Sequence, residues 1–170
     1  MIEKIKKDYN YMKIVGNILD KNEVKKLEQI SHHNTNRLEH SLKVSYYSYK
    51  VSKLLFLDSD QVARGGLLHD FFEERTAYVN SAKEKFNVYT KHSTIALENS
   101  LKLCELTDKE QDMIKAHMFP LDGNIPKYAE SWVVNLVDTG VSVFEFSLKF
   151  KYKLSYAANA SIFILLNLFK

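Results

Sequence analysis

An apolar stretch near the middle of the chain carries a histidine and an aspartate side by side, and this placement restricts how the chain can fold. The stretch runs from Gly65 to Phe72 and reads GGLLHDFF. Burying an imidazole and a carboxylate without partners costs on the order of several kcal/mol. The fold must therefore bring a metal ion or hydrogen-bonding groups to His69 and Asp70.

A metal ion suits this doublet better than hydrogen bonds alone. Consecutive side chains on a helix point about 100° apart, so His69 and Asp70 can reach one ion from two sides, or Asp70 can bridge two ions. Gly65 and Gly66 remove side-chain bulk one turn earlier, where we expect another helix to approach closely. The alternative is a histidine-aspartate pair at a helix end with ordinary hydrogen bonds.

The composition favours a compact helical domain. The 170 residues are 45% hydrophobic and 26% charged, and they include only five glycines and two prolines, so few residues interrupt helices. We predict an all-α, single-domain helical bundle over residues 1–170. Its motif region would span residues 37–138, with packing helices within 1–30 and at 154–169.

The charge pattern and the ends of the chain indicate the setting of the protein. The net charge of +3 comes from 24 basic and 21 acidic residues without a long basic block, which argues against a dedicated nucleic-acid surface. The first thirteen residues lack a signal-type apolar region, and the single Cys104 cannot form an internal disulfide. We therefore expect a cytoplasmic protein without disulfide bonds.

The apolar C-terminal run, residues 157–169, is too short to span a bilayer. It predicts a packing helix, with a homodimer contact or membrane association as alternatives.

Helical periodicity places further histidines inside the bundle. A helix over residues 37–56, capped by Thr35 or Asn36, carries His40 on its inward stripe. The helix that contains the doublet should end near Arg75. Thr90 is expected to cap a helix over residues 91–105 that has His92 in its first turn.

Two later segments complete the pattern. Thr107 and Glu110 match a capping box, and the helix that they start should run through Met118 with His117 on an inward face. Ser131 can begin a helix in which Asp138 is a second carboxylate among apolar residues. Four histidines and two aspartates suit iron, manganese, cobalt, nickel or zinc. These candidate ligands are His40, His69, Asp70, His92, His117 and Asp138.

The order H, HD, H, H, D over residues 37–138 resembles the HD superfamily of metal-dependent phosphohydrolases. Residue by residue, the resemblance implies an HD-type bundle whose shared ligands are His40, His69, Asp70 and Asp138. His92 and His117 match the extra histidines of the two-metal branch, in which the aspartate of the doublet bridges the ions. Two divalent transition-metal ions are thereby implied, iron or manganese first, with nickel, cobalt or zinc as alternatives.

The resemblance also implies an activity and further site residues. Metal-activated water would hydrolyse a small phosphate ester or anhydride, in particular a nucleotide. The chain looks similar to small bacterial HD proteins, including a group that cleaves symmetric dinucleoside tetraphosphates. With the bridging Asp70, Arg37 would contact phosphate and Glu73 would protonate the leaving group or orient water. The alternative for Arg37 and Glu73 is a solvated helix surface.

Three other polar residues are weaker candidates for contact with the substrate. His33 in a loop, Lys91 and Lys115 are candidate substrate contacts, although solvation is the ordinary role of such side chains. His32 and His33 match no ligand of the family. Many relatives place a lysine after the last aspartate, whereas Thr139 and Gly140 follow here, which removes one expected phosphate contact.

Two other classes of function stay open. HD-type di-iron oxygenases share the same six ligands and use oxygen to cleave carbon bonds, and oxygen consumption would distinguish them. A regulatory HD module without catalysis is the weaker alternative, because every ligand position is filled.

Overall fold

The computed structural model describes the backbone of residues 2–32, 35–72 and 82–168, and the side chains of residues 31–32, 82–90 and 149–168 are outside that description. The short elements of the N-terminal part are α1 Ile2–Lys6, α2 Tyr9–Leu19, α3 Asn22–Lys25, the 3-10 helix η1 Lys26–Gln29, β1 Ser31–His32 and β2 Thr35–Asn36. The longer helices are α4 Arg37–Leu54, α5 Ser59–Leu68, α6 Ala82–Leu103, α7 Asp108–Ala116 and α8 Ala129–Leu168.

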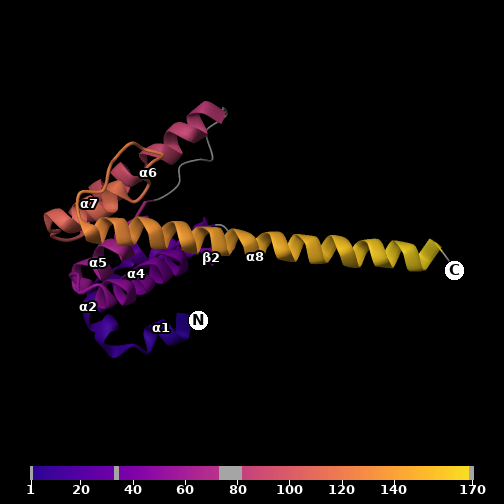
Figure 1. The fold of residues 1–170 in the computed structure, drawn as a ribbon, viewed down its shortest axis with the longest axis horizontal. Coiled ribbons are helices and arrows are strands. Elements are labelled where there is room, and N and C mark those ends of the chain that lie inside the picture. The colour runs from indigo at the N-terminus through magenta and orange to yellow at the C-terminus, as the bar shows by residue number, and fades with distance from the viewer. Residues whose placement is uncertain (1, 33–34, 73–81, 169–170) are drawn as a thin grey trace.

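The all-α prediction is confirmed. The two strands are two residues each and form one antiparallel pair directly before α4. In Figure 1, α4 and α5 lie on one side of the first part of α8, while α6 and α7 lie on the other. The N-terminal helices pack beneath them, with α1 against α4 and α2 against α5.

Two hydrophobic clusters hold these helices together. The larger one joins the N-terminal helices to α4 and α5, and it buries Tyr11, Val15, Leu42 and Leu67 almost completely. A smaller cluster links α4 and α5 to α7 and α8 through Val44, Val62, Met113 and Val134. Cys104 packs at the margin of the larger cluster and is partly buried.

Local capping signals predicted two helix starts correctly. The Asn36 side chain accepts a hydrogen bond from the backbone of Glu39 at 2.9 Å and caps α4. The capping box at α7 is complete, because Thr107 accepts from the backbone of Glu110 and the Glu110 carboxylate accepts from the backbone of Thr107. These bonds satisfy N–H groups that a helix leaves without partners in its first turn.

Several predicted helix boundaries were wrong. Helix α5 ends at Leu68 rather than near Arg75, so the doublet lies in the turn that follows it. Thr90 does not cap a helix, because α6 begins at Ala82 and runs through it. The segments predicted to start at Ser131 and at residue 154 belong to the single helix α8, in which Gly140 weakens the helix by only about 1 kcal/mol.

The two glycines before the doublet stand where helices meet closely, as predicted. A methyl group on Gly66 would lie 3.0 Å from the Cα atom of Ser45 on α4. On Gly65 it would lie 2.8 Å from the sulfur of Met113 on α7. The absence of side chains thus lets α5 sit between α4 and α7, and it carries His69 into the interior.

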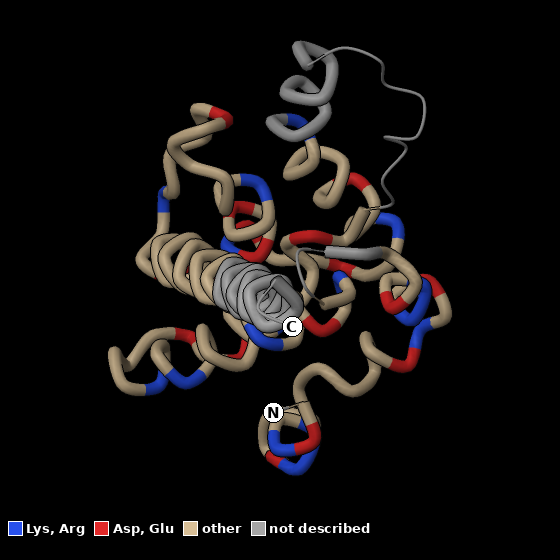
Figure 2. The backbone as a smooth tube through the Cα atoms, turned by 90° about the vertical axis from the view of Figure 1, so that its right-hand side faces the viewer, with Lys and Arg blue, Asp and Glu red and all other residues tan. Residues whose placement is uncertain are grey.

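Positive and negative positions are mixed along the described chain. In Figure 2, lysines and arginines alternate with acidic residues over most helices. Within the described residues, no helix is long and apolar enough to cross a bilayer. The packing role of residues 154–169 stays a prediction, since their side chains lie outside the description.

Candidate metal centre

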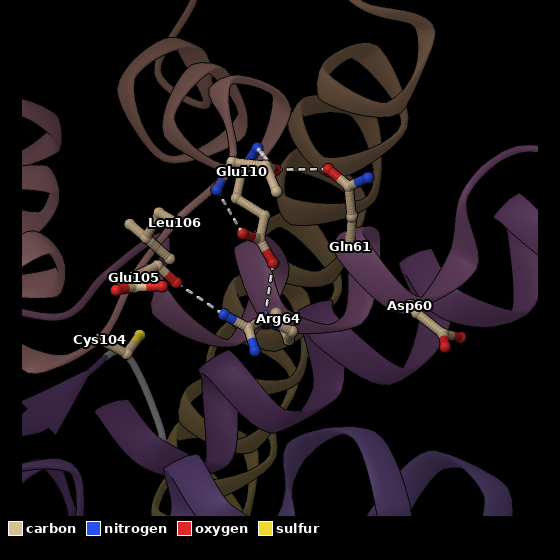
Figure 3. Close-up of a pocket in the computed structure, with 8 residues that line it drawn as sticks. Asp60, Gln61, Arg64, Cys104, Glu105, Leu106 and Glu110 are labelled. Carbon is tan, nitrogen blue, oxygen red and sulfur yellow. Dashed lines mark hydrogen bonds and ion pairs between the residues drawn. The ribbon is translucent and has the colours of Figure 1, made fainter.

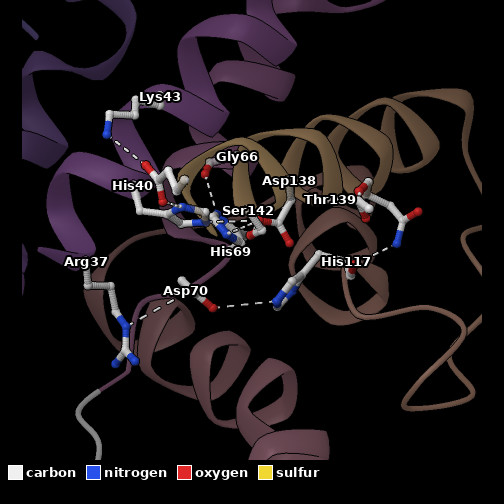
Figure 4. Close-up of polar contacts among 12 residues, drawn as sticks. Arg37, His40, Lys43, Gly66, His69, Asp70, His117, Asp138, Thr139 and Ser142 are labelled. Carbon is white, nitrogen blue, oxygen red and sulfur yellow. Dashed lines mark hydrogen bonds and ion pairs between the residues drawn. The ribbon is translucent and has the colours of Figure 1, made fainter. Parts of the chain in front are cut away.

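Helices α4 to α8 bring all six predicted ligands to one place. His40 lies on α4 and His92 on α6, Asp138 lies on α8, and the others directly follow α5 or α7. Figure 4 shows most of these side chains pointing toward one another between the helices. Five of the six residues are buried, and the Asp138 side chain keeps 14% of its surface exposed.

One group of possible ligands consists of His40, His69 and Asp138. The Oδ1 atom of Asp138 lies 2.9 Å from Nε2 of His40 and 3.7 Å from Nε2 of His69. The ligand atoms of this group all lie within 4.8 Å of one another, which is close enough for one ion to reach them.

A second group surrounds Asp70. Its Oδ1 atom lies 3.2 Å from Nε2 of His92 and 3.6 Å from Nε2 of His117, and these two nitrogens are 2.9 Å apart. The ligand atoms of His69, Asp70 and His117 also lie within 4.8 Å of one another. His69 therefore belongs to both groups, and Asp70 is placed close to their junction.

The protonation of the rings fits metal binding. His69 Nδ1 donates to the carbonyl of Gly66 at 2.8 Å, and His117 Nδ1 donates to that of Ile114 at 2.7 Å. Since a carbonyl only accepts, a neutral ring keeps its lone pair on Nε2, which faces the centre. His69 Nε2 is buried and has no hydrogen-bond partner among the described residues. A cation would satisfy this atom.

The charges in the centre are strongly coupled. Burial lowers the pKa of His40, but its hydrogen bonds to Asp138 and Glu145 outweigh burial and raise the pKa to about 9. Burial raises the pKa of Asp138, yet the hydrogen bond from His40 and the nearby ring of His69 hold it well below the ordinary range. The pKa of Asp70 is likewise lowered against the effect of burial, by the charge of His69 and by the adjacent rings of His117 and His92. The carboxylates are thus ionised and require positive charge beside them.

Arg37 is completely buried, which excludes the alternative that it lies on a solvated surface. Its Nη1 atom donates to the carbonyl of Phe72 at 2.7 Å, and its guanidinium carbon stands 3.8 Å from the centre of the Phe72 ring. Its Nε atom lies 3.9 Å from Oδ2 of Asp70. Arg37 thus adds positive charge beside the centre, and its contact with phosphate stays a prediction.

Three residues of the centre were missed in the sequence. Phe72 stacks on His92 with ring centres 4.8 Å apart, and the guanidinium of Arg37 also lies over the Phe72 ring. Asn135 donates to the carbonyls of His117 and Phe119 at 2.7 and 2.8 Å. Glu145 accepts from the far side of His40. A carboxylate in an uncharged helical run, seven residues after Asp138, was the available signal for Glu145.

The other predicted site residues are exposed or lie outside the described residues. Glu73 and His33 lie outside the described residues, and nothing of the His32 side chain is described. Lys91 and Lys115 are exposed. The roles proposed for Glu73, His33, Lys91 and Lys115 stay predictions. Thr139, which follows Asp138, donates to the carbonyl of Asn135 on its own helix.

A separate hollow lies beside α5 and the start of α7 (Figure 3). Within it, Arg64 donates to the Glu110 carboxylate at 2.6 Å and to the carbonyl of Glu105 at 2.8 Å. Because Arg64 is engaged by these acceptors, the hollow is not assigned a role in anion binding. Its lining residues are Asp60, Gln61, Arg64, Cys104, Glu105, Leu106, Thr107 and Glu110.

Comparison with known proteins gives one match. The family model described as HD domain matches residues 37–144, which is more than half of the chain and includes all six candidate ligands. Searches of the curated proteins and of the solved structures find no match.

Proposed function

Because the chain belongs to the HD domain family, a metal-dependent phosphohydrolase superfamily, we propose that it hydrolyses a small phosphate ester or anhydride, in particular a nucleotide. The observation that carries the proposal is the convergence of four histidines and two aspartates in two groups that share His69. Such mixed nitrogen and oxygen ligands suit first-row transition metals.

The two groups suggest two ions. His40, His69 and Asp138 would hold one, and His92 and His117 would hold the other, with Asp70 between them. Iron or manganese is the first choice, and nickel, cobalt and zinc are alternatives. When bound, the ions supply Lewis acidity and lower the pKa of water, which makes hydrolysis feasible near neutral pH.

The residues of the chain would orient the reacting groups. The Asp70 carboxylate keeps the two ligand groups together, while the buried Arg37 adds a fixed positive charge close to it. The planar fork of an arginine suits phosphate oxygens. Glu73 follows Asp70 by three residues and remains the proposed proton donor to the leaving group. The partner is thus a small anionic molecule; a homodimer and a cytoplasmic location remain predictions.

A direct experiment is a hydrolysis screen on protein purified without oxygen and reconstituted with manganese or iron, with the products separated by chromatography. Mononucleotides, dinucleoside polyphosphates and cyclic dinucleotides cover the nucleotide chemistries, and only the first class is expected to free inorganic phosphate. We expect metal-dependent hydrolysis of at least one class, abolished by a chelator. Oxygen consumption by the iron form without any hydrolysis would instead indicate the oxygenase chemistry that shares these ligands.

A further inference from the structure

Glu145 lies behind His40, on the side away from the other ligands. His40 Nε2 faces Asp138 at 2.9 Å, and its Nδ1 faces Oε2 of Glu145 at 3.0 Å. The second oxygen of Glu145 accepts from Nζ of Lys43 at 2.7 Å. The side chains of Glu145 and Lys43 are only 4% and 9% exposed. Figure 4 shows Lys43 near His40, on the side of the ring away from Asp138.

We propose that Glu145, held in place by Lys43, is a positioning residue that presents His40 to the metal in the right tautomer. The proposal rests on the proposed function only in taking His40 as a metal ligand. Glu145 itself is not a ligand, because His40 and Lys43 occupy its two oxygens. Carboxylates in this position fix the ring of a metal-binding histidine and raise its basicity.

The helix register explains how the pair is assembled. Lys43 follows His40 by three residues on α4, and Glu145 follows Asp138 by seven residues on α8, so each pair shares one helix face. Helices α4 and α8 pack against each other. The contact between α4 and α8 therefore holds two candidate ligands, with Lys43 one turn farther along α4 and Glu145 two turns farther along α8.

The charge balance favours a neutral His40 when a metal is bound. Lys43 and Glu145 neutralise each other, so Glu145 does not need a charged ring as its partner. A neutral ring that donates from Nδ1 to Glu145 keeps its lone pair on Nε2, toward Asp138 and the ligand group. At His69 and His117 backbone carbonyls do the same task. Among these three rings, His40 is thus the one whose tautomer a side-chain substitution can change.

The test is the zinc affinity of Glu145→Gln, measured with a competing chromophoric chelator on the full chain. Lys43 still requires an acceptor, so the introduced amide turns its oxygen to Lys43 and its NH₂ to His40. That arrangement favours a proton on Nε2, where the metal should bind. We expect affinity for one of the bound ions to fall by about 10- to 100-fold.

A second variant should recover part of the zinc affinity that Glu145→Gln loses. In the double variant Lys43→Met with Glu145→Gln, the amide oxygen is free to accept from Nδ1 of His40. The double variant should therefore bind zinc at least a few-fold more tightly than Glu145→Gln alone. Equal or weaker binding by the double variant would overturn the positioning role, because a merely structural pair would not be repaired by losing its second member.

A matched control is Glu110→Gln, which removes another buried carboxylate that is paired with an arginine away from the centre. It should leave zinc affinity within about threefold of the wild type, as expected for a site that it does not touch. The same loss of affinity in Glu110→Gln and Glu145→Gln would contradict the proposal.

The tautomer can also be read directly in the wild-type protein, which keeps the test decisive if a variant does not fold. In the zinc-loaded protein with ¹⁵N-labelled histidine, long-range proton-nitrogen spectra should show His40 protonated at Nδ1. Protonation at Nε2 would overturn the inference. These measurements do not depend on turnover, so a wild type that binds zinc as expected but shows no hydrolysis would count against the proposed function alone.

Discussion

Asp70 lies close to charged and ligand residues from several helices. One oxygen lies 3.2 Å from His92 and 3.6 Å from His117, and the other lies 3.9 Å from Arg37. This single carboxylate thus lies close to residues of α4 and α6 and to His117, which follows α7. Its burial would be unfavourable without positive charge close by.

We expect Asp70→Asn and Asp138→Ala each to reduce hydrolysis to background and to lower the metal content. The first removes the charge between the two ligand groups while it keeps the volume of the side chain. Metal analysis and hydrolysis assays on the reconstituted proteins measure both effects, and Asp20→Asn, which is exposed, serves as the control. Full metal content and turnover in both variants would refute the metal-dependent mechanism.

A second prediction at this scale concerns Arg37. Replacement by alanine should lower kcat/KM, with a loss of transition-state stabilisation of about 2 kcal/mol, the order of one charge-assisted hydrogen bond. The metals should be retained. Arg37→Lys should recover only part of this loss, because lysine lacks the fork that reaches Phe72 and the flat face that stacks on its ring. An unchanged kcat/KM with a lowered Tm in both variants would limit Arg37 to packing.

At the scale of elements, the close packing of α5 on α4 predicts that one added methyl group destabilises the fold. Gly66→Ala would place a Cβ 3.0 Å from the backbone of Ser45, so one of the two helices must move. We expect a destabilisation of about 1–3 kcal/mol in chemical denaturation, typical of overpacking. In α2, Gly16→Ala meets nothing within 4 Å and should be neutral or stabilise by up to about 1 kcal/mol. Similar effects of both substitutions would refute the close approach.

The start of α2 gives a prediction that depends on pH. Asp8 accepts from the backbone of Tyr11 at 3.2 Å and from Lys50 at 2.8 Å. The hydrogen bond from Lys50, against a smaller opposing effect of burial, lowers the pKa of Asp8. A lowered pKa means that the ionised form stabilises the fold above the unfolded value of 3.8, and that this contribution is lost as the pH falls through the lower folded value.

Two substitutions separate the cap from the charge. Asp8→Ala should cost about 1 kcal/mol near neutral pH, because it removes the N-cap. Asp8→Asn keeps a good cap and should cost only about 0–1 kcal/mol, the usual range for an exposed ion pair. Urea unfolding at pH 7 and below pH 3.8 measures both. A cost of Asp8→Asn that does not shrink at the lower pH would contradict the role of the charge.

How much could be read from the sequence differs between helix starts and helix ends. The caps at Asn36 and Thr107 were predictable because a side chain bonds to a backbone group three residues away. The end of α5 and the start of α6 were not predictable, because no local stop signal precedes them. Tertiary packing sets these two boundaries. Residue types and their order indicated the candidate ligands, whereas Glu145 meets His40 only through the packing of α4 on α8, 105 positions apart.

At the scale of the whole molecule, the candidate metal centre connects helices that otherwise touch mainly through apolar side chains. His40 and Asp138 join α4 to α8, and Asp70, His92 and His117 join the end of α5 to α6 and α7. An ion that binds the folded chain and not the unfolded one stabilises the fold by RT ln(1 + [L]/Kd). The metal should therefore act on the stability of the entire bundle.

The last prediction uses this linkage to count the ions. With zinc at about 100 times Kd, each ion should add about 2.7 kcal/mol. For a chain of this size that raises Tm by roughly 5–10 °C over the chelator-treated protein. His92→Ala and His117→Ala should each keep one ion per chain, show a smaller rise in Tm, and lose most of their turnover, because the group around Asp70 is incomplete. Lys102→Ala on α6 is exposed and should behave like the wild type. Metal analysis and circular dichroism melting decide the matter: a wild type that binds one ion, with both histidine variants matching its rise in Tm and its turnover, would replace the two-metal site by a single-metal one.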